Sequence, residues 1–460
     1  MIPRLVIAGT QSGAGKTTIT AGLIAALASR GLQVQGFKTG PDYIDPSCHR
    51  WASGRPGRNL DTWLMTPAQV RAGFLRAAAR ADLAIIEGVM GLYDGAGGAG
   101  EIGSTAHLAK VLRAPVVLVL DARASARSAA AVALGFKVLD PEVPVAGVIC
   151  NRVGSPRHAE MLRDALGSIG LPMLGALPQD DALRVAEGRL GLSLPGGDGS
   201  MPDWIARAKD AVTEHLSLEH LVALAASAGE LPAYGATEST PDPFSPAQAG
   251  RYSGLRVAVA LDAAFWFYYE DTFDLMRHWG VEPVLFSPLH DGRLPSGADG
   301  LYIGGGFPER YAAALAANCA MVASVRSALA KGLPALAECG GYLYLLEGLT
   351  GEDGTVFPMA GCIPGVARLQ PRLQGMGYRT AEPGGVRGHV FHYTRVEDAI
   401  ESSPAWRLYR SGGDFEREDG YRDPAILASY LHVHHATQPQ VLAQFLDRCS
   451  ARKRGGQTHA

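Results

Sequence analysis

The chain has 460 residues, of which 47% are hydrophobic and 19% charged, and its formal net charge is -3. This length predicts two or three domains with sizeable cores, and the small net charge argues against a nucleic-acid partner. Six cysteines without the paired spacing of metal sites favour free thiols in a cytoplasmic protein over a disulfide scaffold. The sequence begins directly with a strand-like segment, and no apolar run reaches the ~18 residues of a membrane span. We therefore expect neither a secretion signal nor a transmembrane helix.

Residues 1–228 alternate strand-like and helix-like segments. Short continuous runs of Val, Ile and Leu are typical of strands buried on both faces of a parallel sheet. Such runs occur at residues 5–8, 34–37, 83–86, 116–120 and 145–150. Stretches rich in Ala, Leu and Arg between them, such as 124–138, predict crossover helices. The pattern indicates an α/β domain with a mostly parallel sheet flanked by helices.

A glycine-rich loop follows the first predicted strand and precedes a helical run at residues 19–29. Strand, glycine loop, Gly-Lys-Thr and helix are the order of an ATP-binding P-loop, in which backbone N–H groups, the helix dipole and a lysine hold phosphates. The candidate ATP-binding residues here are Gly9, Gly13, Gly15, Lys16, Thr17 and Thr18. Five residues separate Gly9 from Gly15 instead of the standard four, a wider loop that resembles the dethiobiotin synthetase branch of P-loop proteins. The alternative is a glycine-rich turn without a ligand.

Acidic residues follow the second and third predicted strands. Asp42 and Asp45 come after the second strand, and Glu87 and Asp94 come after the third. Both positions lie at carboxyl ends of parallel strands, where such sheets bind ligands. Carboxylates together with the Thr17 hydroxyl suit Mg²⁺. The alternative is that the aspartates only cap turns.

Residues 229–254 interrupt this pattern with many Pro, Ser, Thr and Gly residues, which indicates an interdomain linker. A second strand–helix series then begins at residues 255–260. Further strands are predicted at residues 284–287, 300–303 and 334–337. We therefore predict an ATP-binding domain at 1–228, a second α/β domain at 255–450 and a flexible basic tail at 451–460.

The second domain carries a cysteine at a sharp turn. The strand at 334–338 ends at Cys339-Gly340-Gly341, ahead of a helical run at 342–349. A nucleophile between strand and helix, flanked by glycines, has the elbow geometry, and we expect the helix N-terminus to favour the thiolate. An upstream glycine loop at 304–306 offers N–H groups to an oxyanion, and His432 downstream offers a base.

Each of these features has an alternative. A buried cysteine is usually a small core residue, and we assign the other five to that class: Cys48, Cys150, Cys319, Cys362 and Cys449. A cluster of His432, His434 and His435 suggests a metal site, but no cysteine or acidic pair stands at ligand spacing. Cysteine elbow, glycine loop and histidine in this order favour catalysis at Cys339.

The order of these motifs resembles the cobyrinic acid a,c-diamide synthase family, in which a dethiobiotin-synthetase-like ATP domain is joined to a flavodoxin-like class I glutamine amidotransferase domain. The matching segments span nearly the whole chain: residues 9–18, 40–46, 58–61, 87–95, 262–269, 286–289, 304–309, 338–341 and 388–393. The sister family, cobyric acid synthase, shares both domain types. It lacks the Gly-Pro-Asp-Tyr-Ile-Asp and Glu-Gly-Val-Met-Gly-Leu-Tyr-Asp-Gly stretches of this chain.

The resemblance implies a glutaminase site in the second domain. Cys339 would be the nucleophile and His432 its base, and the oxyanion would be bound by the backbone of Gly305, Gly306 and Gly340. Two positions depart from the known patterns. His434 stands where class I amidotransferases usually carry a glutamate that completes a triad, and Val390 replaces the acid of a Gly-His-Glu-Phe-His-Tyr stretch.

The resemblance also implies the residues of the synthetase site. Lys16 and Thr17 would hold phosphates and Mg²⁺, and the metal ligands would be Thr17, Asp45 and Glu87. Asn151 would read adenine. The remaining residues of this site would be Lys38, Asp42 and Asp94.

The implied reaction is amidation of the a and c side-chain carboxylates of a corrin-type macrocycle in cobalamin biosynthesis, using ATP and glutamine. The γ-phosphate would activate each carboxylate, and ammonia released at Cys339 would cross between the domains to displace it. Cobyrinate, hydrogenobyrinate and nickel sirohydrochlorin stay open as substrates, as does a homodimer. The rival functions are a dethiobiotin-synthetase-like ligase that uses CO₂ and a non-catalytic P-loop switch with a degenerate amidotransferase module. The attached cysteine–histidine domain argues against both.

Overall fold

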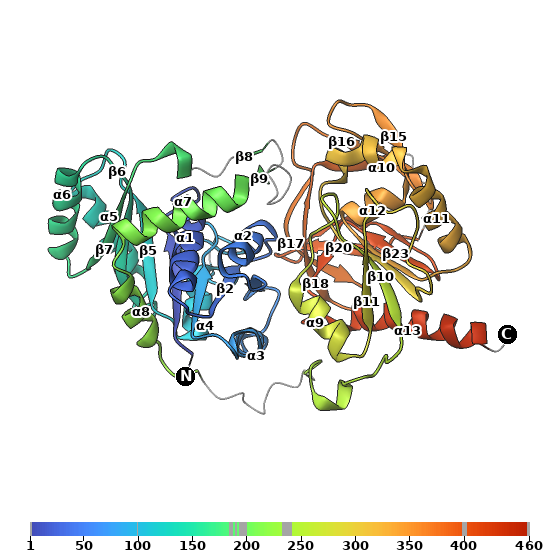
Figure 1. Ribbon diagram of the computed structural model, residues 1–460, viewed down its shortest axis with the longest axis horizontal. Helices are drawn as coiled ribbons and strands as arrows, with labels where there is room; N and C mark the ends of the chain where they lie inside the picture. Colours follow the sequence, from blue (N-terminus) through green and yellow to red (C-terminus); the bar gives the residue numbers. More distant parts are fainter. Residues whose placement is uncertain are drawn as a thin grey trace. The chain divides into compact units, whose positions relative to one another are not determined.

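The computed structural model describes residues 2–98, 100–183, 187–188, 191–192, 200–231, 242–397 and 403–457. The chain forms two compact units, Met1–Ser239 and Thr240–Ala460, each with its own central sheet (Figure 1). Residues 232–241 of the predicted linker lie outside the described residues. The short helix η2 (Pro246–Gln248) precedes the first strand of the second unit.

The first unit is built on a seven-stranded sheet in the order β3-β2-β4-β1-β5-β6-β7, with every neighbouring pair parallel. Its strands are β1 (Arg4–Gly9), β2 (Val34–Thr39), β3 (Arg58–Leu60), β4 (Leu83–Glu87), β5 (Val116–Asp121), β6 (Val145–Val153) and β7 (Met173–Pro178). Strands β1, β2 and β4 are buried along their whole length, because helices cover both faces. The predicted strands lie within β1, β2, β4, β5 and β6, whereas β3 and β7 were not predicted.

Three helices of the first unit begin at a residue whose side chain caps them. Thr66 and Gln69 form a capping box at α3, and Ser104 and Ser155 cap α4 and α6. The helices are α1 (Lys16–Ser29), α2 (Ile44–Ser53), α3 (Pro67–Ala78), α4 (Thr105–Leu112), α5 (Ser128–Leu139), α6 (Pro156–Gly167), α7 (Ser200–His215) and α8 (Leu218–Ala226). The short elements η1 (Asp181–Leu183), β8 (Glu187–Gly188) and β9 (Gly191–Leu192) lie between β7 and α7.

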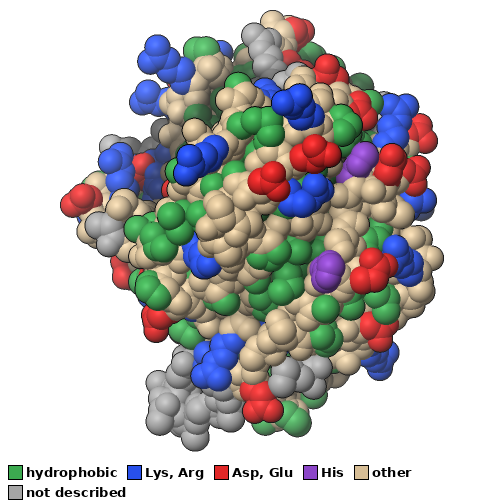
Figure 2. Space-filling model, turned by 90° about the vertical axis from the view of Figure 1, so that its left-hand side faces the viewer, with side chains coloured by type: hydrophobic (Ala, Val, Ile, Leu, Met, Phe, Trp, Pro, Cys, Tyr) green, Lys and Arg blue, Asp and Glu red, His purple; other side chains and the backbone are tan. Residues whose placement is uncertain are grey.

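Helix α1 packs against α2 and α7. On the face of the first unit that carries α5 and α6, hydrophobic side chains lie among charged ones (Figure 2). The exposed apolar residues of these two helices are Val132, Leu134, Val138, Leu139 and Met161.

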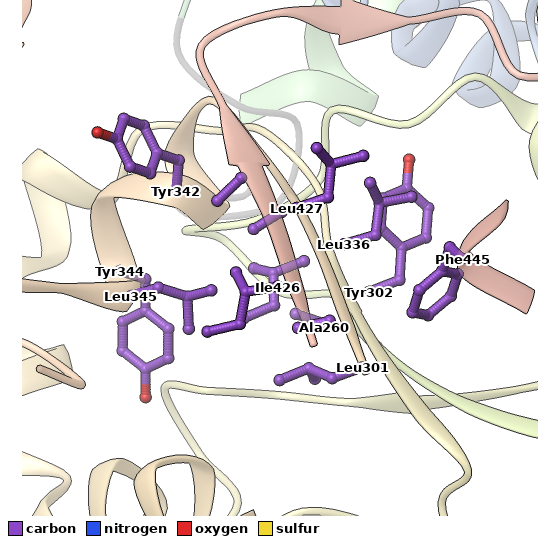
Figure 3. Close-up of a cluster of buried hydrophobic side chains, with 14 of the residues drawn as sticks. Ala260, Leu301, Tyr302, Leu336, Tyr342, Tyr344, Leu345, Ile426, Leu427 and Phe445 are labelled. Atoms are coloured by element: carbon purple, nitrogen blue, oxygen red, sulfur yellow. The ribbon is translucent and has the colours of Figure 1, made fainter. Parts of the chain in front are cut away.

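The second unit has a six-stranded central sheet in the order β11-β10-β12-β13-β23-β22, parallel except for the β22–β23 pair. Its strands are β10 (Arg256–Ala260), β11 (Glu282–Phe286), β12 (Gly300–Ile303), β13 (Ala335–Glu338), β22 (Tyr421–Arg422) and β23 (Ile426–Ser429). The helices are α9 (Glu270–His278), η3 (Pro308–Tyr311), α10 (Ala312–Ala317), α11 (Cys319–Ala330), α12 (Gly340–Leu345) and α13 (Pro439–Gln457). Figure 3 shows side chains of β12, β13 and β23 in a buried cluster with residues of α12 and α13.

Two further sheets of this unit were not predicted. They have the orders β15-β14-β16-β19 and β21-β20-β17-β18-β24, and they are antiparallel except for the β14–β16 pair. Their strands are β14 (Leu346–Thr350), β15 (Val356–Pro358), β16 (Ile363–Leu369), β17 (Gly375–Glu382), β18 (Val386–His392), β19 (Thr394–Glu397), β20 (Trp406–Arg410), β21 (Phe415–Asp419) and β24 (His432–Val433). The helix predicted at 342–349 is wrong in its second half, because α12 ends at Leu345. Leu346, Glu347 and Leu349 are good helix formers, so pairing with β15 and β16 overrides local propensity in this segment.

The carboxyl-terminal region differs from its prediction as well. Helix α13 continues through the basic residues to Gln457, where a flexible tail was expected from 451. Lys453 Nζ donates to Gly254 O at 2.6 Å and lies 2.9 Å from an Asp299 carboxylate oxygen, which ties this end of the helix to the unit.

Among the described helices, none is by itself long and apolar enough to cross a membrane. One pair, Pro308–Ala317 and Cys319–Ala330, reaches that length and hydropathy only together, with a bend of 94° at the break.

Candidate functional site

The strand order brings the P-loop and the predicted acidic residues to one edge of the first sheet. Strand β1 leads into the P-loop, and its neighbour β4 ends at Glu87. The Cα of Glu87 is paired with that of Ile7 on β1 and with that of Lys38 on β2. Lys38, Glu87 and the start of the P-loop therefore meet at the carboxyl ends of three adjacent parallel strands.

Glu87 is the centre of a buried polar cluster. Its Oε1 accepts hydrogen bonds from Thr17 Oγ1 at 2.6 Å and from Lys38 Nζ at 3.0 Å. Its Oε2 lies 2.7 Å from His49 Nε2. Burial by itself raises the pKa of Glu87, but Lys38 and His49 outweigh burial and hold that pKa below its usual range. Glu87 is therefore ionised, and it orients the Thr17 hydroxyl at the start of α1.

Asp45 lies in the same cluster and pairs with the Lys38 ammonium. Burial, followed by repulsion from Asp42 and Glu87, holds the pKa of Asp45 well above its ordinary value. Three carboxylates thus act on the Lys38 ammonium, and the Lys16 ammonium interacts with Glu87 and Asp45 as well. The raised pKa of Asp45 shows that these two ammonium groups do not fully stabilise its ionised form. An added cation beside Asp45 would favour its ionised form.

The donors of this cluster fit Mg²⁺ by their chemistry, because hydroxyl and carboxylate oxygens are the hard ligands that it prefers. No ready-made group of three or more His, Cys, Asp or Glu ligands occurs in the described part of the chain. That arrangement is compatible with Mg²⁺, which takes few protein ligands and keeps phosphate oxygens and water. It gives no support to a metal site at His432, His434 and His435.

The P-loop itself is held closely by neighbouring residues. Lys16 Nζ donates to Met90 O at 2.6 Å and to Gln11 O at 3.2 Å, and burial together with Lys38 lowers the pKa of Lys16 to about 8. Gly15 has a φ of 99°, and a Cβ there would lie 2.1 Å from Asn151 Nδ2, so only glycine fits at this position. Asn151 therefore lies against the loop, and its Nδ2 donates to the backbone oxygen of residue 14 at 2.9 Å.

The other predicted residues of this unit lie near the loop. Thr18 Oγ1 donates to Leu183 O at 3.2 Å. Asp42 Oδ1 accepts from the backbone N–H of residue 44 at 2.7 Å, and Asp94 Oδ2 accepts from that of residue 91 at 2.8 Å. Both aspartates thus accept hydrogen bonds from nearby backbone N–H groups, which is the turn-capping role that the sequence analysis gave as the alternative to a site role. Asp42 in this way stabilises the start of α2.

His49 is a member of the cluster that the sequence analysis missed. It lies on α2 four residues after Asp45, and residues at this spacing share one face of a helix. Asp45 was already a candidate ligand, so its four-residue spacing to His49 on a predicted helix would have indicated that His49 lies beside it.

In the second unit, three adjacent strands likewise end at one edge. Strand β12 leads into the glycine loop at residues 304–306, β13 leads to Cys339, and β23 leads towards His432. The backbone N–H of Cys339 donates to Ser429 O at 2.7 Å. Cys339 has φ 46° and ψ -104°, a sparsely populated conformation that costs on the order of 1–3 kcal/mol. Such a strained turn is the elbow that the sequence predicted.

The glycine loop contacts both the cysteine elbow and the histidine. A Cβ on Gly305 would lie 2.4 Å from His432 Cε1, and a Cβ on Gly340 would lie 3.0 Å from Gly306 N. Side chains are excluded at these positions. The structure therefore brings together all five residues predicted for this site.

Cys339 and His432 are both uncharged in this environment. Cys339 is 4% exposed, and burial followed by the charge of Glu309 raises the pKa of its thiol well above the usual range. Burial and the neighbouring His389 lower the pKa of His432 to about 3. The expectation that the helix N-terminus favours the thiolate is therefore wrong, and α12 has only six residues. A neutral imidazole is nevertheless able to accept the proton of the thiol.

Glu338, which precedes the nucleophile, holds the histidine segment in place. Its Oε1 accepts from Val433 N at 3.0 Å and lies 3.2 Å from His435 Nε2, and its Oε2 accepts from Tyr302 Oη at 2.9 Å. His434 instead packs on the ring of Tyr269, with centroids 4.5 Å apart. The Glu338 carboxylate thus contacts His435, a pairing that the sequence analysis did not predict.

The stretch at residues 388–393 forms part of the cysteine site. His389 on β18 is the Cα partner of His432 on β24, and the two rings stack at 4.7 Å. The Phe391 carbonyl oxygen lies 3.7 Å from Cys339 Sγ, which donates to it. Val390 is 1% exposed, so an apolar side chain occupies a position where an acid would lose its hydration.

Comparisons with known proteins identify both units. Residues 5–191 match the CobQ/CobB/MinD/ParA nucleotide binding domain, and residues 256–440 match the CobB/CobQ-like glutamine amidotransferase domain. The hydrogenobyrinate a,c-diamide synthase of Streptomyces coelicolor is 44% identical over 97% of this chain and 98% of its own length. That of Thermobifida fusca is 42% identical over 98% of each chain. The cobyrinate a,c-diamide synthase of Priestia megaterium is 40% identical, also over 98% of each chain.

Two domain matches and full-length relatives at this identity agree with the motifs and with the two sites. The chain belongs to the cobyrinate and hydrogenobyrinate a,c-diamide synthase family of glutamine-hydrolysing carbon–nitrogen ligases.

Proposed function

We propose that this enzyme converts the a and c side-chain carboxylates of cobyrinate or hydrogenobyrinate into carboxamides, using ATP and glutamine. The observation that carries the proposal is that one chain holds both sites. The first unit has a P-loop cluster suited to phosphoryl transfer. In the second unit, the cysteine elbow and the neutral imidazole of His432 both contact the glycine loop at residues 304–306. The names of the full-length relatives supply the class of macrocycle. We further infer a cytoplasmic enzyme without nucleic-acid or membrane partners, and a homodimer stays a prediction.

Glutamine hydrolysis would begin with proton transfer from the Cys339 thiol to His432. The sulfur then attacks the carboxamide carbon of glutamine, and the developing oxyanion accepts hydrogen bonds from backbone N–H groups of Gly305, Gly306 or Gly340. His432 returns the proton to the leaving nitrogen, so that ammonia departs and a glutamyl thioester remains. Water then hydrolyses the thioester to glutamate and restores the thiol.

Amide formation would use the cluster of the first unit. A macrocycle carboxylate oxygen attacks the γ-phosphate of ATP, ADP leaves, and ammonia displaces phosphate from the acyl phosphate. Lys16 would neutralise charge on the phosphates, while Glu87 would orient Thr17. When bound, Mg²⁺ would supply charge neutralisation at the phosphate oxygens, held by Thr17, Asp45 and Glu87.

Product analysis tests this proposal. The purified enzyme would be incubated with ATP, Mg²⁺ and glutamine, separately with cobyrinate, hydrogenobyrinate and nickel sirohydrochlorin, and each product weighed by mass spectrometry. We expect two successive losses of about one mass unit, one for each replacement of OH by NH₂, with cobyrinate or hydrogenobyrinate. Conversion of nickel sirohydrochlorin alone, or of none of the three, would contradict the proposed substrate class.

Replacing His432 by Asn is expected to lower glutamine hydrolysis by roughly 10²–10⁴-fold, because the thiol loses its proton acceptor. His434→Asn should cost less than about tenfold, since His434 packs on Tyr269 and the carboxylate contact belongs to His435. Glutamate release reports the effect, and amidation with ammonium salts should persist in both variants. A larger loss in the His434 variant than in the His432 variant would make His434 the base.

A further inference from the structure

One buried carboxylate beside the nucleophile has no part in the mechanism above. Glu309 lies in η3, directly after the glycine loop, and is 6% exposed. Its Oε2 is buried and has no hydrogen-bond partner among the described residues. A carboxylate oxygen left in this state costs free energy in the folded protein, which suggests that its partner is a ligand.

Glu309 and Cys339 border the same cavity. Its walls also include Gly306 from the glycine loop and the segment that links β18 to β19. The cavity has a volume of about 10 Å³, which is room for a single water molecule. Glutamine must therefore widen this cavity to reach the sulfur. An attractive contact between glutamine and a residue of the cavity wall would offset part of the free energy that the widening costs.

Among the described residues, no lysine or arginine lines the cavity beside Glu309. The guanidinium of Arg310, the next residue in η3, is paired with another carboxylate, that of Glu352, at 3.4 Å. His392, which also lines the cavity, is neutral because burial and Arg417 lower its pKa to about 4. Burial accordingly raises the pKa of Glu309 to about 7. Above pH 7, where Glu309 is mostly ionised, the cavity thus offers a negative charge beside the reacting sulfur, and the cation that acts on it, Arg310, lies outside the cavity.

We propose that Glu309 binds the α-ammonium group of glutamine and thereby sets the γ-carboxamide against Cys339. The ammonium and the carboxamide of glutamine are joined by a short aliphatic chain, so the cavity bordered by both Glu309 and Cys339, once widened by the entering substrate, would accommodate the two ends. The same pairing selects glutamine over amides that lack an amino group. This inference rests on the glutaminase activity proposed above and adds its substrate-recognising residue.

The test compares two substrates that differ only at the invoked group. Glutaramate is glutamine without its α-amino group, and its carboxamide is unchanged. For Glu309→Gln we expect kcat/KM for glutamine to fall roughly 10- to 100-fold, as for loss of a buried charge-assisted hydrogen bond. The kcat/KM for glutaramate should change less than about twofold, since it never formed the pair.

Two further variants separate recognition from folding. Glu309→Asp keeps the charge and should recover part of the preference for glutamine. Glu397→Gln removes a half-exposed charge of the same unit that pairs with Arg368 outside the cavity, and it should leave both substrates unaffected. Glu309→Gln should also raise the melting temperature at pH 8 by several degrees, and less at pH 5. The pKa of Glu309 is raised from 4.5 to about 7 in the folded protein. Its ionisation therefore destabilises the folded state more and more as the pH rises from 4.5 to 7, and by a constant amount above pH 7.

The outcomes distinguish this inference from the function on which it rests. Equal losses for glutamine and glutaramate would assign Glu309 to the chemistry of Cys339 or to the fold, and unchanged kinetics would deny it any role; either result overturns the inference alone. An unaltered enzyme that releases no glutamate from glutamine would overturn the proposed glutaminase and this inference together.

Discussion

Replacing Cys339 with alanine is expected to abolish glutamine hydrolysis and glutamine-dependent amidation while amidation with ammonium salts continues at the wild-type rate. Without the sulfur no thioester forms, and the loss should exceed about 10³-fold. Added ammonia bypasses this step and meets the acyl phosphate directly. Glutamate release and amide product, each measured with either nitrogen source, check the two halves of this expectation.

Another cysteine of the same unit provides a matched control. Cys362 is partly buried and its thiol donates to Ala360 O at 3.7 Å, so Cys362→Ala removes a thiol without touching the elbow. It should retain glutaminase activity. Wild-type glutamine turnover in the Cys339 variant would show that the elbow does not carry the nucleophile.

The central sheets were predictable because their strands are buried on both faces. Runs such as residues 83–86 and 300–303 contain only apolar residues or glycine, and this signal survives without knowledge of the partners. In a parallel sheet the carboxyl ends of neighbouring strands meet at one edge. For that reason Lys16, Glu87 and Cys339 were identified as candidate site residues from motifs at strand ends alone.

The antiparallel sheets were not predictable in the same way. Strand β17 is buried at some positions and partly exposed at others, and it contains glycines that weaken the strand signal. These sheets place His389 and Phe391 beside the cysteine site, so their contribution became visible only with the pairing of β18 and β24.

Electrostatic states also depend on contacts that are distant in sequence. The neutral thiol of Cys339 follows from burial and from Glu309, thirty residues away, whereas the local motif favoured a thiolate. The contact between Glu338 and His435 likewise joins segments that a one-dimensional pattern does not relate. Sequence motifs located the reacting groups, and tertiary packing sets their protonation.

Replacing Lys16 with alanine is expected to stop amide formation with either nitrogen source, by roughly 10²-fold or more, because charge at the phosphates is left without its lysine. Burial and Lys38 lower the pKa of Lys16 to about 8, so its ammonium is still charged at pH 7. Lys38 is committed to Asp45 and Glu87 and is not placed to substitute for it. Amide product formed with ammonium salts isolates this step from glutamine hydrolysis.

The matched control for this prediction is Lys110→Ala. Lys110 lies on α4 of the same unit and pairs with Glu101 and Asp140, so amidation should continue. The Lys16 variant should also retain the uncoupled glutaminase of the second unit, since no atom of Lys16 belongs to that site. Unchanged synthesis from ammonium salts in the Lys16 variant would show that carboxylate activation takes place away from the P-loop. Loss of synthesis with retained glutaminase would instead locate the ATP-dependent step there.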